Sequence, residues 1–328
     1  MSCELLKAYG LQLIAKKATM TRFTYPLLLS ILLLVFSCGG GSVKKDPAPS
    51  HPAMKQLQKG LAWYQRGCFQ QALVAFTKAH ELFTASDRMP GVAMSLNNIG
   101  NVYRYIGDSQ SALLFFQEAY KIYSRLDNLE GVIQTLSNQA AIHIKDERLD
   151  EAAVLIQTTE KMAASSGKVL VHVLNNKGIL LTRQHRYDEA ETILLRALET
   201  TAPENVHTYA TVCRSLGNLM VEKADYDRAL TYYEKALFFD RQSEFHPGLA
   251  DNLKAVGKVY LQLEKYDQAV AYFQRSIKIY ALFGDSEQVS RTMNILEETA
   301  TRANTDVTLT RYFVDKWSKG EILEHPCQ

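Results

Sequence analysis

The same pattern of small and large residues recurs about every 40 positions through most of this chain of 328 residues. Each copy starts at a small residue, has large residues at the third and sixteenth positions after it, and has small residues at the twelfth and nineteenth. Internal repeats of about this period are typical of solenoids of stacked helical hairpins. The six starting residues, called origins below, are Gly60, Gly100, Ala140, Gly178, Gly217 and Gly257.

The spacing of these residues predicts two helices in each copy. Steps of three, four and seven residues keep side chains on one face of an α-helix. Small residues at the origin and at the twelfth position let two antiparallel helices approach closely, and the large residues fill the space between them. The stretch from the seventh to the ninth position is expected to be the tight turn. The third copy departs most, because Ala140 and His143 replace a glycine and an aromatic residue, but Leu149, Ala152 and Ile156 hold the register.

The pattern resembles the tetratricopeptide repeat over roughly residues 53–283, and segment 98–123 (NIGNVYRYIGDSQSALLFFQEAYKIY) is the best single match. That repeat is normally 34 residues long. The longer copies here resemble the extended form found in kinesin light chain and in spindle-orientation adaptors. The resemblance implies an all-α fold, namely an α-solenoid of about six helical hairpins.

The two ends of the repeats have the character of solenoid ends. In the first copy, the polar Gln56 and Lys59 stand at positions that are apolar in the second copy, which suits a terminal helix without a neighbour. Residues 284–328 are expected to form C-terminal capping helices and a tail, the first of them from Ser286 to Arg302. A final short helix is expected to cover the last hydrophobic surface or, alternatively, to dock on a partner. Its apolar face carries Leu309, Tyr312, Phe313 and Trp317.

Residues 1–37 have the character of a signal peptide, with Met20 as the better start. The apolar run at 26–36 is shorter than the roughly 20 residues that span a bilayer. It leads into Val35-Phe36-Ser37-Cys38, which resembles the lipobox of bacterial lipoproteins. The resemblance implies cleavage before Cys38 and acylation of its thiol, with palmitate as a candidate fatty acid. A plain secretory signal and an uncut short anchor are the alternatives.

The lipoprotein resemblance also implies a location. Gly39, not Asp, follows the cysteine, which in enterobacterial lipoproteins implies transport to the outer membrane. We therefore expect a lipid-anchored protein of the bacterial cell envelope that faces the periplasm. Residues 38–52 are rich in Gly and Pro and are expected to be a flexible tether.

Charge and motifs exclude several classes of function. The formal net charge is +2, and without residues 1–37 it is about −1, so the body has no electrostatic footprint for nucleic acid. No catalytic or metal-binding motif occurs, so we expect neither an enzyme nor a cofactor. His143 is expected in the core and His185 in a solvated turn.

The cysteines form no metal-binding pattern. Cys213 lies at a packing position and is expected to be buried. Pairing of Cys68 with Cys213 is implausible across a rod-like array, and a link from Cys68 or Cys327 to another molecule is left open.

One stripe of polar residues is the candidate binding site. In the family this stripe lines the superhelical groove that holds peptides, and asparagine side chains can pair with a ligand backbone. Its members are Asn97, Asn101, Tyr105, Lys145, Asn175, Arg183, Arg214, Asn218, Lys254 and Lys258. The basic residues Arg183, Arg214, Lys254 and Lys258 bias the groove toward acidic ligands. One version of the family grips a C-terminal carboxylate with a clamp of Lys, Asn and Arg side chains. Ala255 stands where that clamp has an asparagine, so the clamp is incomplete here. The alternative is a solvated polar face without a ligand.

These observations predict an adaptor, a lipid-anchored scaffold that holds a partner protein or peptide in its groove. A regulatory protein that senses a small peptide is the second hypothesis. The third, an enzyme with an unrecognised site, has no motif in its favour.

Overall fold

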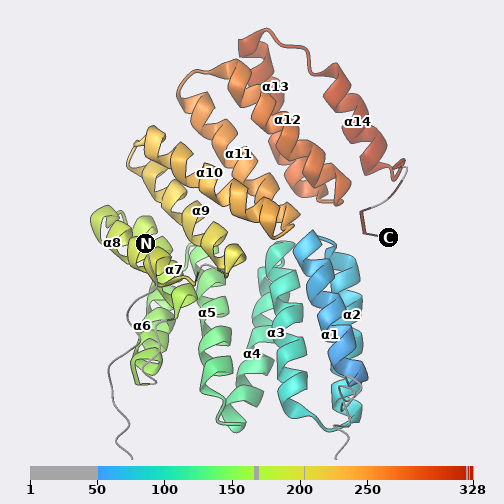
Figure 1. Cartoon of the computed structure of the whole chain (residues 1–328), viewed down its shortest axis with the longest axis vertical. Coiled ribbons are helices and arrows are strands. Elements are labelled where there is room, and N and C mark those ends of the chain that lie inside the picture. The colour runs from blue at the N-terminus through green and yellow to red at the C-terminus, as the bar shows by residue number, and fades with distance from the viewer. Residues whose placement is uncertain (1–50, 166–169, 203, 323, 325, 328) are drawn as a thin grey trace, which may run out of the picture. The chain divides into compact units, whose positions relative to one another are not determined.

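The structure is a computed structural model that describes residues 51–165, 170–202, 204–322, 324 and 326–327. The chain divides into two units, residues 1–49 and 50–328. The signal peptide, the lipidation of Cys38 and most of the tether lie outside the described residues. Within those residues fourteen helices follow one another without a strand (Figure 1). They are α1 (Pro52–Arg66), α2 (Phe69–Ala85), α3 (Met89–Tyr105), α4 (Ser109–Arg125), α5 (Leu129–Lys145), α6 (Leu149–Ser165), α7 (Val171–Arg183), α8 (Tyr187–Thr200), α9 (Val206–Glu222), α10 (Tyr226–Gln242), α11 (His246–Gln262), α12 (Tyr266–Leu282), α13 (Ser286–Ala303) and α14 (Thr308–Ser318).

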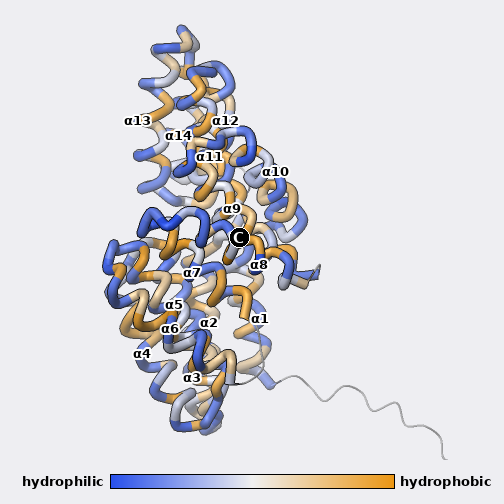
Figure 2. The backbone as a smooth tube through the Cα atoms, turned by 90° about the vertical axis from the view of Figure 1, so that its left-hand side faces the viewer, coloured by the Kyte–Doolittle hydropathy of each residue, from blue (hydrophilic) through white to orange (hydrophobic). Residues whose placement is uncertain are grey.

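The twelve helices from α1 to α12 form the six hairpins that the repeat predicts, so the all-α solenoid is confirmed. Every origin lies in the first helix of its hairpin, and the large residue at the sixteenth position lies in the second. A Cβ added to Gly100 would lie 2.7 Å from the ring of Phe116, which is fully buried. The origin is therefore small because the aromatic ring of the second helix rests on it. Along each helix of the described part, apolar and polar segments alternate (Figure 2).

The turn inside each hairpin has one fixed feature. The seventh position after the origin takes a left-handed conformation in all six copies, with φ between 56° and 93°. Only the first two copies have the glycine that this conformation favours. The other four have Glu147, His185, Ala224 and Glu264, and a left-handed conformation costs a residue with a Cβ roughly 1 kcal/mol. The tight packing of the two helices therefore dictates this turn more strongly than its residue does.

The C-terminal helices confirm one prediction and correct another. Helix α13 spans almost the range predicted for it. Helix α14 exists and packs on α12, but the face that touches the core carries Thr310 and Val314, which are 3% and 7% exposed. The predicted covering residues Leu309 and Tyr312 are 68% and 55% exposed. Of the residues predicted to cover the core, only Trp317 packs against it.

The solenoid is not a rod, because its first hairpin contacts the start of α11, the first helix of the sixth hairpin. Tyr64 packs against Phe245 with ring centroids 6.4 Å apart, and a Cβ added to Gly67 would lie 2.8 Å from Pro247. Tyr105 of the second hairpin also packs on Phe245, at 5.9 Å. These contacts, centred on Phe245 and Pro247, are called the closure below.

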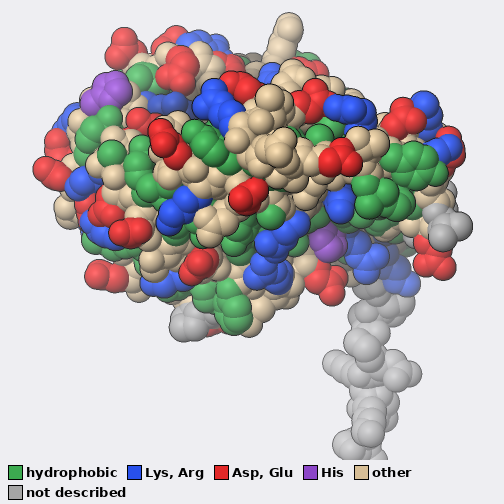
Figure 3. Space-filling view, turned by 90° about the horizontal axis from the view of Figure 1, so that it is seen from above, with side chains coloured by type: hydrophobic (Ala, Val, Ile, Leu, Met, Phe, Trp, Pro, Cys, Tyr) green, Lys and Arg blue, Asp and Glu red, His purple; other side chains and the backbone are tan. Residues whose placement is uncertain are grey.

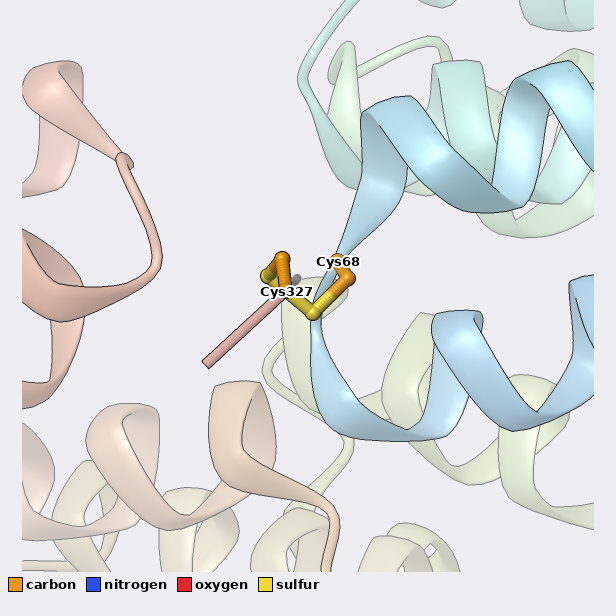
Figure 4. Close-up of a disulfide and its surroundings, with 2 residues drawn as sticks. All are labelled: Cys68 and Cys327. Carbon is orange, nitrogen blue, oxygen red and sulfur yellow. A yellow bond between two sulfur atoms is a disulfide. The ribbon is translucent and has the colours of Figure 1, made fainter. Parts of the chain in front are cut away.

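A disulfide lies beside the closure and corrects the expectation for the cysteines. Cys68, in the first turn, bonds to Cys327 in the tail, 259 residues later (Figure 4). The sequence leaves open a link from either residue to another molecule and does not predict that the two pair with each other. Since the repeats bring their two ends together, the link forms within one chain. Cys213 is buried and free, as predicted.

Candidate binding groove

The inner face of the later hairpins encloses a cavity of about 730 Å³. Its walls come from α7, α9 and α11, the first helices of three successive hairpins, from the turns that follow α5 and α7, and from Tyr233 of α10. Stacked first helices present equivalent positions side by side, so residues at the same position of different repeats converge on one space. This cavity is called the groove.

Five of the eight predicted binding residues line the groove, namely Arg183, Arg214, Asn218, Lys254 and Lys258. The other three do not. Asn97 and Asn175 are 3% and 6% exposed because the neighbouring first helices cover them. Asn97 accepts a hydrogen bond from Asn138 at 3.0 Å, and Asn101 accepts one from Arg104 at 3.4 Å.

An acidic residue that the polar stripe does not include lies among the groove cations. Asp251 lines the cavity with its carboxylate 4.0 Å from the guanidinium of Arg214 and 3.9 Å from the ammonium of Lys254. Its two oxygens accept hydrogen bonds from the hydroxyls of Tyr105, at 3.2 Å, and Tyr280, at 2.5 Å. Asp251 therefore partly neutralises the two cations.

Most of the positive charge in the groove is matched by acidic groups. Arg183 stands 3.7 Å from Glu147, and Glu222 also lines the cavity. Lys258 is exposed and makes no ion pair with any described side chain. The groove therefore attracts acidic ligands less strongly than four unpaired cations would. What attraction remains comes from Lys258 and from the unused hydrogen-bond donors of its neighbours.

Arg214 has unused hydrogen-bonding capacity in the groove. Its side chain is only 26% exposed, yet no described residue accepts a hydrogen bond from it. Burial would lower the pKa of Arg214, but Asp251 and other nearby groups raise it, so the group stays charged. The Oδ1 atom of Asn218 accepts a hydrogen bond from the hydroxyl of Tyr233 at 2.7 Å. This leaves the amide N–H groups of Asn218 available for a ligand.

A buried acid lies just behind the groove wall. Asp240 of α10 is 2% exposed, and burial raises its pKa to about 6. Its Oδ2 accepts a hydrogen bond from Asn252 at 2.6 Å. On the closure side, burial lowers the pKa of His207, which packs on Phe245, to about 4.

The remaining titratable candidates have ordinary structural roles. His143 is partly buried, with a pKa lowered by burial, and His185 lies exposed in its turn, as predicted.

Lys and Arg side chains alternate with Asp and Glu over the face seen from above, without a large patch of one sign (Figure 3). Among the described residues no group of three His, Cys, Asp or Glu side chains could hold a metal ion. None of the fourteen described helices is both long and apolar enough to cross a bilayer.

Solved structures share this architecture at low sequence identity. A Rap protein complexed with competence and sporulation factor is 15% identical, with a TM-score of 0.55 over 76% of this chain and 76% of that one. The Rap conjugation gene regulator of plasmid pLS20, in complex with the Phr* peptide, is 15% identical, with a TM-score of 0.53 over 83% and 77%. A signal transduction ATPase with a tetratricopeptide repeat sensor, from Pyrococcus horikoshii, is 16% identical, with a TM-score of 0.51 over 81% and 40%.

The family comparison agrees with the repeat register. No curated protein matches the chain. The model of the tetratricopeptide repeat matches residues 52–125, 169–242 and 216–282, which together make up more than half of the sequence. The chain therefore belongs to the tetratricopeptide repeat family.

Proposed function

We propose that this protein is a scaffold that binds a peptide, or an extended segment of a partner protein, in its groove. The observation that carries the proposal is Arg214, a partly exposed guanidinium that lines a cavity of about 730 Å³ and donates no hydrogen bond to a described residue. Its N–H donors are therefore free to bind a ligand. A ligand rich in carbonyl or carboxylate oxygens would supply acceptors for them.

The charges of the groove limit the kind of ligand. Asp251, Glu147 and Glu222 would repel a long acidic segment, since like charges placed together cost several kcal/mol. Lys258 and the free amide of Asn218 suit a single carboxylate, with the peptide backbone on the neighbouring donors. Binding, not catalysis, is the function we propose.

A peptide-sensing regulator is the second candidate. It is favoured by the two Rap structures, both solved with a peptide bound and both similar in fold to at least three-quarters of this chain. In this version, ligand binding would alter how the hairpins stack.

Photo-crosslinking in intact cells tests the groove. A photoreactive residue at Gln262, which lines the cavity, should capture a partner, and one at Gln157 on the second helix of the third hairpin should not. Lys258→Glu should reduce the capture at least about fivefold, because it reverses the unpaired charge of the groove. Lys161→Glu, also an exposed lysine without an ion pair, is the matched control. Equal capture from both positions, or capture indifferent to Lys258→Glu, would place binding elsewhere.

We also propose that the protein is lipid-anchored in a bacterial cell envelope and faces the periplasm. The lipobox-like sequence at Cys38 motivates the anchor. The Cys68–Cys327 bond supports an oxidising compartment, because structural disulfides persist in the periplasm and are rare in the cytosol.

Membrane fractionation tests the anchor. Cys38→Ser should release the protein from membranes that have been washed with high salt, because no thiol remains to be acylated. Labelling with a palmitate analogue should be lost in the same variant and kept in Cys213→Ala. A Cys38→Ser protein that still sediments with washed membranes would contradict the anchor.

A further inference from the structure

The groove and the closure share one carboxylate. Asp251 lies in the groove, where it faces Arg214 and Lys254 at 4.0 and 3.9 Å. The same carboxylate accepts the hydrogen bond of Tyr105, a residue of the second hairpin that is 146 positions earlier in the chain. Tyr105 packs on Phe245 and so belongs to the closure.

The contacts of Asp251 resemble those that an anionic ligand would make. It supplies negative charge to two cations but holds neither at hydrogen-bonding distance, and its hydrogen bonds come from Tyr105 and Tyr280 instead. An incoming carboxylate could approach Arg214 more closely than Asp251 does, because the donors of Arg214 are unused by the described residues. The two carboxylates would then repel each other in a partly enclosed space.

We infer that Asp251 is a built-in competitor for anionic ligands, and that ligand binding in the groove is coupled through Asp251 and Tyr105 to the opening of the closure. This inference rests on the proposed function and adds a regulation to it. A ligand carboxylate on Arg214 and Lys254 favours states in which Asp251 has moved away. Movement of Asp251 breaks its hydrogen bond with Tyr105 and loosens the packing of Tyr105 on Phe245. Coupling between two events is reciprocal, so an open closure binds anions more tightly.

The disulfide provides a reporter for the closure. Cys68 and Cys327 are 1% and 4% exposed, so a reductant reaches their sulfurs only when this region opens. The rate at which dithiothreitol reduces the bond in the folded protein therefore measures opening. Tyr105→Phe removes only the hydroxyl that binds Asp251 and keeps the aromatic packing.

The experiment measures the reduction rate and the binding of dansyl-labelled tetraglycine in parallel, because the terminal carboxylate of this peptide is its only charged group. Tyr105→Phe should speed reduction and tighten tetraglycine binding by about threefold or more. Asp251→Asn should tighten binding at least about tenfold, since it removes the competing charge. N-acetylated tetraglycine without the label should speed reduction of the wild-type bond. Tyr120→Phe and Asp227→Asn, exposed residues that do not line the groove, should change neither quantity.

The results separate the inference from the proposed function. If Tyr105→Phe changes neither reduction nor binding, or if Asp251→Asn fails to tighten binding, the coupling is wrong even when Gln262 captures a partner. If these variants behave as stated while capture from Gln262 fails, the coupling is correct and the proposed partner-binding function is wrong.

Discussion

At the scale of single residues, local patterns predicted packing better than they predicted charge. Gly100 and Phe116 follow from the repeat, because one hairpin contains both. Asp251 does not, because it lies six positions before its origin, outside the polar stripe. Its partner Tyr105 comes from a hairpin 146 residues away. No local spacing in the sequence predicts that these two residues meet in space, because their separation depends on how far each repeat rotates relative to the next.

The buried acid Asp240 gives a prediction about pH. Burial raises its pKa from 3.8 to about 6, so the folded state binds the proton more tightly than the unfolded state does. Ionisation of Asp240 therefore lowers the free energy of unfolding as pH rises from about 4 to 6, by an amount on the order of 3 kcal/mol. Asp240→Asn removes this ionisation. The variant should gain stability relative to wild type by about that amount when both are moved from pH 4 to pH 7.

Urea unfolding of both proteins across this pH range checks the prediction. The informative quantity is the difference in the free energy of unfolding between the two proteins. His207, whose pKa burial lowers to about 4, destabilises the folded protein as pH falls, and this partly hides the effect of Asp240 in wild type. A difference that is constant between pH 4 and pH 7 would mean that Asp240 titrates alike in the folded and unfolded states.

At the scale of elements, the sequence predicted where helices lie more reliably than which face they bury. The periodic pattern in α13 and α14 located both. In α14, however, Thr310 and Val314 form one candidate face, and Leu309, Tyr312 and Phe313 form another. Since the second face is more apolar, the sequence predicts that this face is the buried one. The structure buries the other, and Val314 packs into the core that α12 and α13 also form.

The buried face of α14 can be tested with one pair of variants. Val314→Asp should destabilise the protein by roughly 3 kcal/mol, because it places an unpaired charge against the core formed with α12. Tyr312→Ser should change the free energy of unfolding by about 0.5 kcal/mol or less, since that side chain is 55% exposed. Urea unfolding followed by circular dichroism measures both. A larger loss of stability for Tyr312→Ser than for Val314→Asp would mean that the buried face is the one predicted from the sequence.

At the scale of the whole solenoid, the contact between the first hairpin and the start of the sixth could not be predicted. Each repeat contacts mainly its neighbours, and a small rotation per repeat accumulates over the stack. A change of a few degrees per repeat would separate Tyr64 from Phe245. The sequence left open a link from Cys68 or Cys327 to another molecule, and only the arrangement of all the hairpins shows that the two cysteines bond to each other.

Removal of the disulfide should therefore weaken the whole solenoid. Cys327→Ser is expected to lower the free energy of unfolding by about 2–5 kcal/mol, as loss of a native disulfide typically does. Reductant should bring wild type to the stability of the variant and should leave the variant unchanged. If Cys327→Ser is as stable as the oxidised wild type, the bond adds nothing to the stability of the fold.

The bond between Cys68 and Cys327 also makes the intervening chain a single covalent loop, which contains every residue that lines the groove. A protease that cuts once inside this loop would produce two fragments that remain joined. They would migrate as one species on a non-reducing gel and separate only after reduction. A single cut thus breaks the polypeptide without releasing either half of the binding surface.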